Sequence, residues 1–272
     1  MKVTYLGTAA AEGFPAVFCN CSYCNGARTL GGKNIRTRSQ TLINDDLLVD
    51  LPADTYSHFL QNGIAGDNIQ YLLITHSHSD HLYSAELVMR HGAFARNMRI
   101  PELQVFCGMG AYKKLQSTLT DKLGFTLTLV KHYERLQIGN YEIIPLPARH
   151  AEGDDALIYV IRGDKTILYA HDTGYLYDEV LEYLEKERLY FDFISLDCTN
   201  VDIPIADTGA HMGIPNIERL LEKLTEIRAI DGKTVKYINH FSHNANPMHT
   251  VLEERVKDIG LLVSYDGLQV NL

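Results

Sequence analysis

The chain has 272 residues, of which 46% are hydrophobic and 22% charged, and its formal net charge at pH 7 is −9. These values are typical of one large or two small globular domains, and they argue against a broad nucleic-acid surface, which requires clustered Lys and Arg. The sequence contains no apolar run of about 18 residues that could span a membrane and no signal-peptide pattern after Met1, so we expect a cytoplasmic protein.

The first half of the chain alternates between apolar runs and polar loops. A strand over Lys2–Leu6 leads into a long Gly- and Cys-containing loop that ends near Arg38. The further elements predicted here are a hairpin of Thr41–Asn44 and Leu47–Leu51, which turns at Asp45-Asp46, a strand over Tyr71–Thr75, a segment of helical spacing over Leu82–Met98, a strand over Leu103–Cys107, a helix over about Ala111–Leu123 and a strand over Thr126–Val130.

The second half repeats the order of strands followed by helices. Its predicted elements are strands near Tyr141–Leu146, Ala156–Ile161 and Thr166–Ala170, helix Tyr177–Arg188, strand Phe191–Leu196, helix Ile214–Ile227, strand Val235–Asn239 and helix Thr250–Ile259. With no low-complexity linker, this pattern predicts a single domain over residues 1–272, of the α/β class. Two groups of strands favour two sheets packed face to face with helices outside, although element order alone leaves other α/β arrangements open.

The most informative segment directly follows the strand Tyr71–Thr75 and contains His76, His78, Asp80 and His81. His76 and His78 are two residues apart, so in an extended chain they project to the same side and can chelate one ion. Asp80 and His81 fall where the chain turns away and can reach a second ion nearby. Imidazole and carboxylate donors suit zinc, manganese or iron, and four such donors in six residues are rarely a chance polar loop.

These residues form the pattern HxHxDH, in which the chain resembles the metallo-β-lactamase superfamily of metal-dependent hydrolases. The resemblance covers essentially the whole chain and implies a four-layer αββα sandwich with two active-site ions. It implies three further ligands, each at a strand end: His150 for the first ion, Asp172 bridging both ions, and His240 for the second. His171 departs from the usual small or polar residue before the bridging Asp, and it is either a hydrogen-bonding support or merely packed.

Five cysteines, an odd number, predict metal or thiol chemistry instead of a disulfide framework. Cys19, Cys21 and Cys24 supply three thiolates, and a closed structural zinc site requires a fourth ligand. His243, three residues after His240, is the best candidate, and the alternative is three free thiols in a loop. Cys107 and Cys198 lie in or beside apolar strands and are predicted to be buried small hydrophobic residues.

The stretch Leu6–Pro15, followed by C-x-C-x2-C, narrows the resemblance to the PhnP-like phosphodiesterase branch, which includes the carbon–phosphorus lyase accessory enzyme. In that branch the cysteines and a His near the last active-site His hold a structural zinc. The resemblance therefore implies two Zn²⁺ or Mn²⁺ ions in the active site and one structural Zn²⁺. It is also compatible with a homodimer.

Two ions bridged by Asp172 would lower the pKa of a bound water, and the resulting bridging hydroxide would attack the phosphorus of a small, cyclic or linear phosphodiester. The leaving alkoxide then needs a proton. His211, in a Gly-flanked loop before a helix, resembles the His that contacts the substrate phosphate in this branch and is the candidate acid. His211 and Asp80 are accordingly the predicted catalytic residues.

Other functions share parts of this pattern. A β-lactamase commonly lacks both the second-site His and a bridging carboxylate, which are present here as His81 and Asp172. A thioester hydrolase shares the metal ligands and stays open, whereas a tRNA 3′-processing nuclease is expected to carry a basic arm that this sequence lacks. Nucleic acid is therefore an unlikely partner beyond mono- or short oligonucleotides. A non-catalytic carrier resembling the pyrroloquinoline quinone pathway member remains an alternative from a different class.

Overall fold

The computed structural model describes residues 1–118 and 123–272, and its described strands form two seven-stranded sheets. The first sheet has the order β14-β1-β2-β3-β4-β5-β6, and the second has the order β13-β12-β11-β10-β9-β8-β7. The strands of the first sheet are β1 (Lys2–Gly7), β2 (Gln40–Ile43), β3 (Leu47–Val49), β4 (Tyr71–Ile74), β5 (Leu103–Cys107), β6 (Phe125–Leu129) and β14 (Gln269–Asn271). Those of the second are β7 (Leu136–Ile138), β8 (Tyr141–Pro147), β9 (Leu157–Arg162), β10 (Thr166–Ala170), β11 (Phe193–Asp197), β12 (Val235–Asn239) and β13 (Leu262–Val263).

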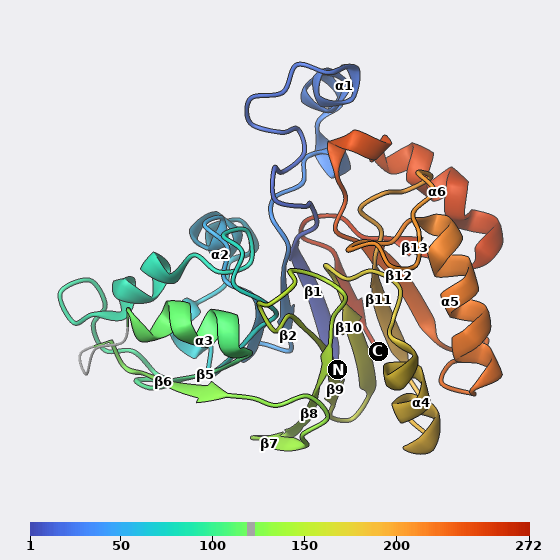
Figure 1. Ribbon diagram of the computed structural model, residues 1–272. Helices are drawn as coiled ribbons and strands as arrows, with labels where there is room; N and C mark the ends of the chain where they lie inside the picture. Colours follow the sequence, from blue (N-terminus) through green and yellow to red (C-terminus); the bar gives the residue numbers. More distant parts are fainter. Residues whose placement is uncertain (119–122) are drawn as a thin grey trace.

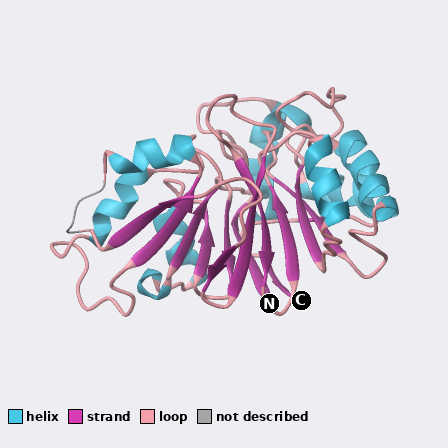
Figure 2. Cartoon of the chain, turned by 60° about the horizontal axis from the view of Figure 1, so that its bottom comes forward, coloured by secondary structure: helices cyan, strands magenta, loops and turns pink. Residues whose placement is uncertain are grey.

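Helices lie on the outer faces of both sheets, and one lies apart (Figures 1 and 2). The helices are α1 (Ser22–Leu30), α2 (Thr55–Asn62), α3 (Met109–Gln116), α4 (Asp178–Lys186), α5 (Ile214–Glu226) and α6 (His249–Val256). Helices α2 and α3 pack on the first sheet, whereas α4, α5 and α6 pack on the second. This arrangement confirms the predicted four-layer αββα sandwich.

The side chains of each strand alternate between the two faces of its sheet and so pack in two different cores. In β3, Leu47 and Val49 point into the core between the sheets, and Leu48 points into the core under α2 and α3. In β1, Val3 and Tyr5 likewise face the second sheet. Successive strand residues point to opposite faces, so an almost continuously apolar strand must be covered on both sides. The second sheet covers one face of these strands, and the helices cover the other.

The predicted elements of the second half agree with the structure to within about two residues at most ends, and Thr166–Ala170 and Val235–Asn239 match fully. The predicted hairpin is also present, since β2 and β3 pair antiparallel across Asp45-Asp46. None of the described helices is long and apolar enough to cross a membrane.

Three predictions in the first half differ from the structure. The loop before Arg38 contains α1, in which the Cys21 side chain caps the N-terminus by accepting from the Cys24 N–H, and which ends at Gly31 with φ of 61°. The segment Leu82–Met98 contains only a 3₁₀ helix over Ser84–Arg90, whose Leu87 packs in the core. Beyond it, Asn97 has a φ of 55°, which a right-handed helix does not accommodate. The predicted helix over Ala111–Leu123 is α3, which ends at Gln116, and residues 119–122 lie outside the described part of the chain.

The carboxyl ends of several strands meet at one edge of the sandwich. Strands β3 and β4 run parallel in the first sheet, as do β10, β11 and β12 in the second. The segments that follow β4, β8, β10 and β12 carry every histidine and aspartate predicted from the HxHxDH resemblance. The fold therefore gathers residues from position 76 to position 240 at one place.

Candidate metal centre and active site

The first donor group consists of His76, His78, His150 and Asp172, whose donor atoms all lie within 4.8 Å of one another. The Oδ2 atom of Asp172 lies 3.1 Å from His76 Nε2 and 3.3 Å from His150 Nε2. His150 Nε2 is also 3.2 Å from His78 Nδ1. His78 is exposed and His150 half-buried, so this group lies at the solvent side of the cluster.

The second donor group consists of Asp80, His81, His240 and again Asp172, and all four residues are buried. Asp172 Oδ2 lies 3.0 Å from His81 Nε2 and 3.8 Å from His240 Nε2. His81 Nε2 is 3.3 Å from Asp80 Oδ2. The two groups therefore share Asp172, and its Oδ2 atom is the point on which four histidines converge. We name the combined set the Asp172 cluster.

The donor atoms of the Asp172 cluster fit divalent cations. Within the described chain, Nε2 of His76, His81 and His240 and Oδ1 of Asp172 are buried and form no hydrogen bond. An unpaired buried nitrogen or oxygen is costly, and native proteins nearly always satisfy it. A cation accepting these converging lone pairs removes that cost, and the imidazole and carboxylate set suits zinc or manganese.

Two buried carboxylates that sequence reasoning missed hold the histidine rings from behind. Asp50 accepts a hydrogen bond from His81 Nδ1 at 2.7 Å, and from the backbone N–H and hydroxyl of Thr75. Asp197 Oδ2 lies 3.4 Å from His240 Nδ1, and the Thr199 hydroxyl links them, 2.8 Å from Nδ1 and 3.0 Å from Oδ2. A proton on Nδ1 leaves the Nε2 lone pair for the ion, which is the usual arrangement of metal-binding histidines.

Neither carboxylate belongs to a local motif, but each comes where an apolar strand ends. Asp50 follows β3, and Asp197 is the last residue of β11. Both are 0% exposed. Charged residues are almost never fully buried unless paired, so a carboxylate at the carboxyl end of a buried strand is the signal that could have indicated them.

His211 lies beside the Asp172 cluster, as the sequence predicted. Its Nδ1 is 3.1 Å from Asp172 Oδ1 and 3.2 Å from Asp197 Oδ2, and its ring stacks on that of His240. Burial lowers the pKa of His211, but the neighbouring Asp197 and Asp172 carboxylates outweigh burial and raise this pKa to about 9. The side chain remains 28% exposed, so it is accessible from solvent.

The loop that carries His211 approaches the cluster closely because two glycines face each other. A Cβ atom on Gly174 would lie 1.8 Å from the carbonyl oxygen of Gly209. Any side chain at position 174 would therefore push the His211 loop away from Asp172.

Three residues of the site adopt the left-handed backbone region that favours glycine. They are Asp50 (φ of 67°), Asp172 (φ of 54°) and His240 (φ of 64°). Such conformations cost free energy and persist where the surrounding structure enforces them, typically at functional sites. Asp50 and His240 directly follow the ends of β3 and β12, and Asp172 comes two residues after the end of β10. At each of these points the chain turns and directs the side chain to the metal-donor region.

His171 has a hydrogen-bonding role beneath Asp172. It is 0% exposed. Its Nε2 lies 2.6 Å from Ser195 Oγ and its Nδ1 lies 3.1 Å from Asn239 Nδ2. Asn239 therefore donates to Nδ1 and the Nε2–H donates to Ser195. Burial holds the pKa of His171 well below its usual value, so the ring is neutral.

The cysteine cluster consists of Cys19, Cys21, Cys24 and His243, whose donor atoms lie within 4.8 Å of one another. His243 Nδ1 is 3.4 Å from Cys19 Sγ and 3.7 Å from Cys21 Sγ. Tetrahedral zinc with the usual Zn–S and Zn–N bond lengths sets sulfur–nitrogen separations of roughly 3.6 Å, which these distances match. The structure therefore brings His243, the fourth ligand expected from the sequence, beside the three cysteines.

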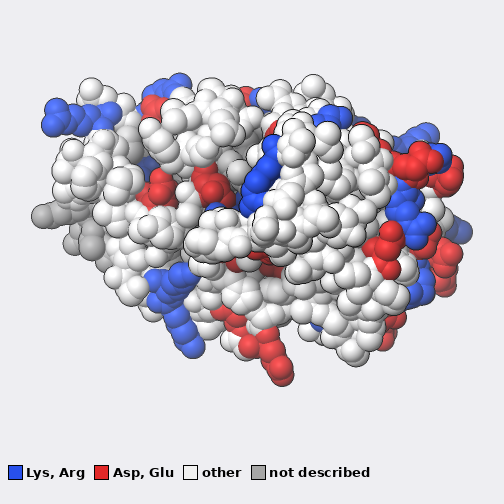
Figure 3. Space-filling view, turned by 90° about the horizontal axis from the view of Figure 1, so that it is seen from above, with Lys and Arg blue, Asp and Glu red and all other residues white. Residues whose placement is uncertain are grey.

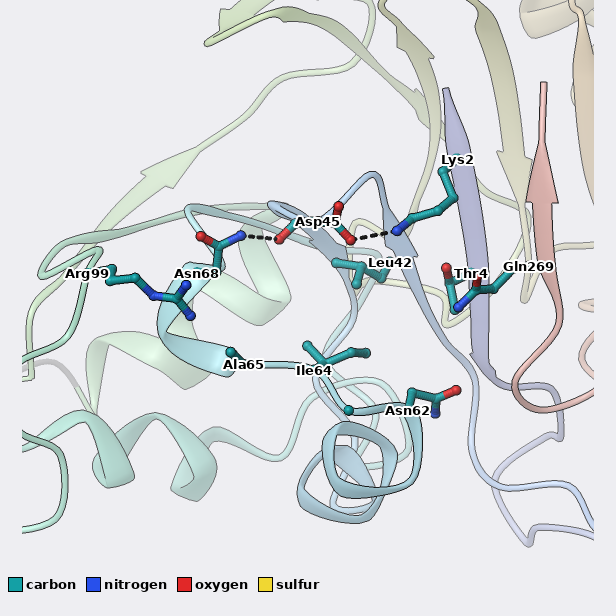
Figure 4. Close-up of a pocket in the computed structure, with 11 residues that line it drawn as sticks. Lys2, Thr4, Leu42, Asp45, Asn62, Ile64, Ala65, Asn68, Arg99 and Gln269 are labelled. Carbon is teal, nitrogen blue, oxygen red and sulfur yellow. Dashed lines mark hydrogen bonds and ion pairs between the residues drawn. The ribbon is translucent and has the colours of Figure 1, made fainter.

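Other predicted features lie outside both clusters. Cys107 and Cys198 are buried, as expected. Arg36 is 2% exposed and donates to Thr8 Oγ1 and the Ser264 carbonyl. The polar cavity of about 240 Å³ in Figure 4 includes no donor of either cluster, and its Lys2 is already paired with Asp45.

Charged side chains on the face shown in Figure 3 are scattered and of both signs. The described residues visible there form no broad basic patch, which agrees with the expectation from net charge.

Comparisons with known proteins agree on the fold. A family model described as "Beta-lactamase superfamily domain" matches residues 51–241. A curated relative, "Coenzyme PQQ synthesis protein B" of Acinetobacter baumannii (strain ACICU), is 24% identical over 329 aligned positions that cover 100% of both chains.

Two solved structures are similar over nearly their full lengths. One is described as a new diphosphatase from the PhnP family, with a TM-score of 0.74 and 20% identity, covering 100% of this chain and 97% of that one. The other is Zn²⁺-bound PqqB from Methylobacterium extorquens, with a TM-score of 0.73 and 15% identity, covering 100% of both chains. At these identities the likeness shows the fold alone.

Proposed function

The chain belongs to the beta-lactamase superfamily, and on that premise we propose that it is a metal-dependent phosphodiesterase acting on a small phosphodiester. In this proposal His76, His78 and His150 hold one divalent ion, and Asp80, His81 and His240 hold the second. Asp172 is shared between them. Cys19, Cys21, Cys24 and His243 hold a structural zinc.

Two divalent ions, when bound, activate water as a nucleophile and neutralise charge on phosphate oxygens. The chain's own residues orient the reaction. Asp172 would hold both ions, because histidines of both donor groups lie within 3.1 Å of its Oδ2 atom. Asp80, 3.3 Å from His81 Nε2, is proposed as a ligand and as the carboxylate that accepts a hydrogen bond from the attacking water.

The observation that carries the proposal is the position of His211. Its Nδ1 lies within hydrogen-bonding distance of Asp197 Oδ2, at 3.2 Å, and a proton donated there would leave Nε2 for a substrate bound over the cluster. From there the ring can bind a phosphate oxygen and then deliver a proton to the leaving alkoxide. A positioned general acid contributes typically ~100- to 10,000-fold to the rate. A hydrolase whose leaving group needs no proton gains little from such a residue.

The similar proteins support two different functions for this chain. The description of one structural neighbour as a diphosphatase of the PhnP family favours phosphoester chemistry. The relative named for coenzyme PQQ synthesis, similar over its full length, favours the carrier alternative. The buried unpaired donors around Asp172 favour a loaded metal centre in either case, and only the His211 arrangement distinguishes the two.

The direct test is hydrolysis of bis(p-nitrophenyl) phosphate by the purified protein with added Mn²⁺ or Zn²⁺, and again after chelation. We expect metal-dependent turnover that chelation abolishes and metal restores. A p-nitrophenyl thioester or carboxylic ester assayed in parallel separates the phosphodiesterase from other hydrolases. Absence of turnover on every ester under all metal conditions would contradict the proposal and favour a carrier.

Given phosphodiesterase activity, a panel of substrates narrows the class. Cyclic sugar phosphates, cyclic nucleotides and short oligonucleotides differ in whether the phosphodiester is cyclic or linear. The scattered surface charge in Figure 3 favours small substrates over long nucleic acids. Turnover that rises with oligonucleotide length would contradict that expectation.

A further inference from the structure

Helix α3 contributes no donor to the Asp172 cluster, yet it contacts both loops that supply the first donor group. Lys114 of α3 extends its Nζ atom to the segment after β4. There it donates to the carbonyl oxygens of Ser77 at 2.6 Å and Leu82 at 2.8 Å. These two carbonyls flank the stretch that carries His78, Asp80 and His81, so one ammonium group ties its two ends together.

The opposite end of α3 holds the loop that carries His150. The backbone N–H of Gly110 donates to the Asp154 carbonyl at 3.0 Å, and the N–H of Met109 donates to Asp155 Oδ2 at 3.1 Å. Asp154 also crosses to the other loop, because its Oδ2 accepts from the Ser77 N–H at 2.6 Å. Ser77 is therefore held on its N–H by Asp154 and on its carbonyl by Lys114.

Two glycines make this contact sterically feasible. A Cβ atom on Gly110 would lie 1.6 Å from Asp154 Oδ1, and one on Gly108 would lie 2.3 Å from the Asp155 carbonyl oxygen. Contacts this short are not tolerated, so the helix can approach the loop only with glycine at both positions. The sequence Cys107-Gly108-Met109-Gly110 thus has a steric reason in the structure.

The first donor group needs such support more than the second does. His81 and His240 have buried carboxylates behind them, Asp50 and Asp197. The exposed His78 instead has its side-chain contact with His150 itself, whose Nδ1 donates to the Ala210 carbonyl at 3.3 Å. The separation of His78 and His150 therefore depends on how their two loops are held.

We infer that Lys114 and Asp154 are positioning residues, which hold His78 and His150 at the separation required by the first metal position. The inference rests on the metal centre of the proposed function. It assigns α3 a larger role in loading the first ion than the second. Both loops that supply the histidines of the first group contact this helix, whereas in the second group His81 is also held by Asp50, and His240 comes from a segment after β12.

The experiment compares Lys114→Met with Lys113→Met, an exposed neighbour on the same helix. Metal-free protein is titrated with Mn²⁺ and the bound ions are followed calorimetrically. As a hard ion, Mn²⁺ reports on the histidine and carboxylate positions and binds thiolates poorly. Loss of a residue that orients metal ligands typically weakens metal affinity by 10- to 100-fold.

We expect the Lys114→Met protein to bind one of two Mn²⁺ ions at least about tenfold more weakly, and the other to be weakened clearly less, because His81 keeps its hydrogen bond to Asp50. Lys113→Met should match the wild type, and Lys114→Arg, which keeps two N–H donors, should recover most of the affinity. Equal affinities for Lys114→Met and Lys113→Met, in a wild type that binds two ions, would overturn the inference while leaving the proposed function intact. A wild type that binds no Mn²⁺ would overturn both.

Asp154→Ala is a second, independent variant in case Lys114→Met folds poorly. It should weaken the same ion, because it frees the Ser77 N–H from the other side. Thermal unfolding of the metal-free variants separates positioning from general stability. Weakening of both ions in proportion to a lowered melting temperature would contradict a selective positioning role.

Discussion

Each donor group of the Asp172 cluster, like the cysteine cluster, has metal-type donor atoms within 4.8 Å of one another, but the protein holds the two clusters in different ways. The donors around Asp172 follow strand ends in the core and are supported from behind by the buried carboxylates of Asp50 and Asp197. The cysteine cluster lies in the N-terminal arm, residues 8–38, whose helix α1 projects away from the sheets (Figure 1). Its apolar support comes from a small group that includes Ala9, Phe14 and Ala27.

This difference shows which cluster the fold can form without a cation. The strand-end donors are positioned by the sandwich, so their geometry should survive metal removal. The arm has only a small apolar core, and hydrogen bonds such as Ala10 N–H to the Phe241 carbonyl join its base to the segment of His243. An ion held by the thiolates and His243 would extend that link to α1. The two clusters should therefore respond differently to loss of a ligand.

The largest effect is expected from Asp172→Asn, which removes the charge shared by both donor groups. Both ions should bind much more weakly, and phosphodiester hydrolysis should fall by about 1,000-fold or more, because each metal contributes several kcal/mol to the reaction. The cysteine-bound ion should stay. Metal content and turnover are measured on the same sample, with the exposed Asp258→Asn as the control. If turnover is retained, Asp172 is not a residue of the active site.

His211→Ala separates the acid from the metal centre. We expect a loss of ~100- to 10,000-fold on an alkyl phosphodiester, whose poor leaving group needs a proton, and a much smaller loss on bis(p-nitrophenyl) phosphate. The bound-metal count should be unchanged. His91→Ala, outside both clusters, is the matched control. An equal loss on both esters would show that His211 binds phosphate without acting as an acid.

Cys21→Ser tests the cysteine cluster. One ion per chain should be lost, and amide hydrogen exchange over the arm should rise, because the cysteine-bound ion no longer holds α1 in place. Hydrolysis should fall less than about tenfold, since the donors around Asp172 are fixed by the sheets. Ser22→Ala serves as the exposed neighbouring control. If the wild type binds two ions per chain and the Cys21→Ser variant also binds two, the cysteines are free thiols.

The smallest effect is expected from His171→Gln, beneath the bridging residue. The amide cannot reproduce both hydrogen bonds, to Ser195 and from Asn239, so the free energy of unfolding should drop by about 1–3 kcal/mol. Chemical denaturation of the metal-free protein measures this, with His91→Gln as the control. Unchanged stability would show that His171 is packed without structural consequence.

The sequence predicted the donors well because metal chemistry leaves local patterns. HxHxDH and C-x-C-x2-C place several ligands within a few residues, and strand ends carry the remaining ones. Asp50 and Asp197 could not be found in this way, since each stands alone in the sequence and acquires its role only when the fold places it behind a histidine.

Helices and strands were likewise predicted well where the local sequence determines them, and less well where contacts made in the folded protein do. Strands with continuous apolar runs were predicted closely, as in Thr166–Ala170. The apolar spacing of Leu82–Met98 predicted a long helix, yet Leu87 only anchors a 3₁₀ segment to the core. In contrast, α1 has few apolar residues and depends on the Cys21 cap and the Gly31 ending, which a hydrophobic pattern does not show.

The most direct test of a metal-dependent phosphodiesterase is a Zn²⁺ titration of the metal-free protein, with turnover of bis(p-nitrophenyl) phosphate recorded against ions bound per chain. The first equivalent should enter the thiolate site and restore little activity, and the next two should restore turnover. Full turnover after the first equivalent would contradict the separate roles of the two clusters. No turnover after three would contradict the phosphodiesterase itself.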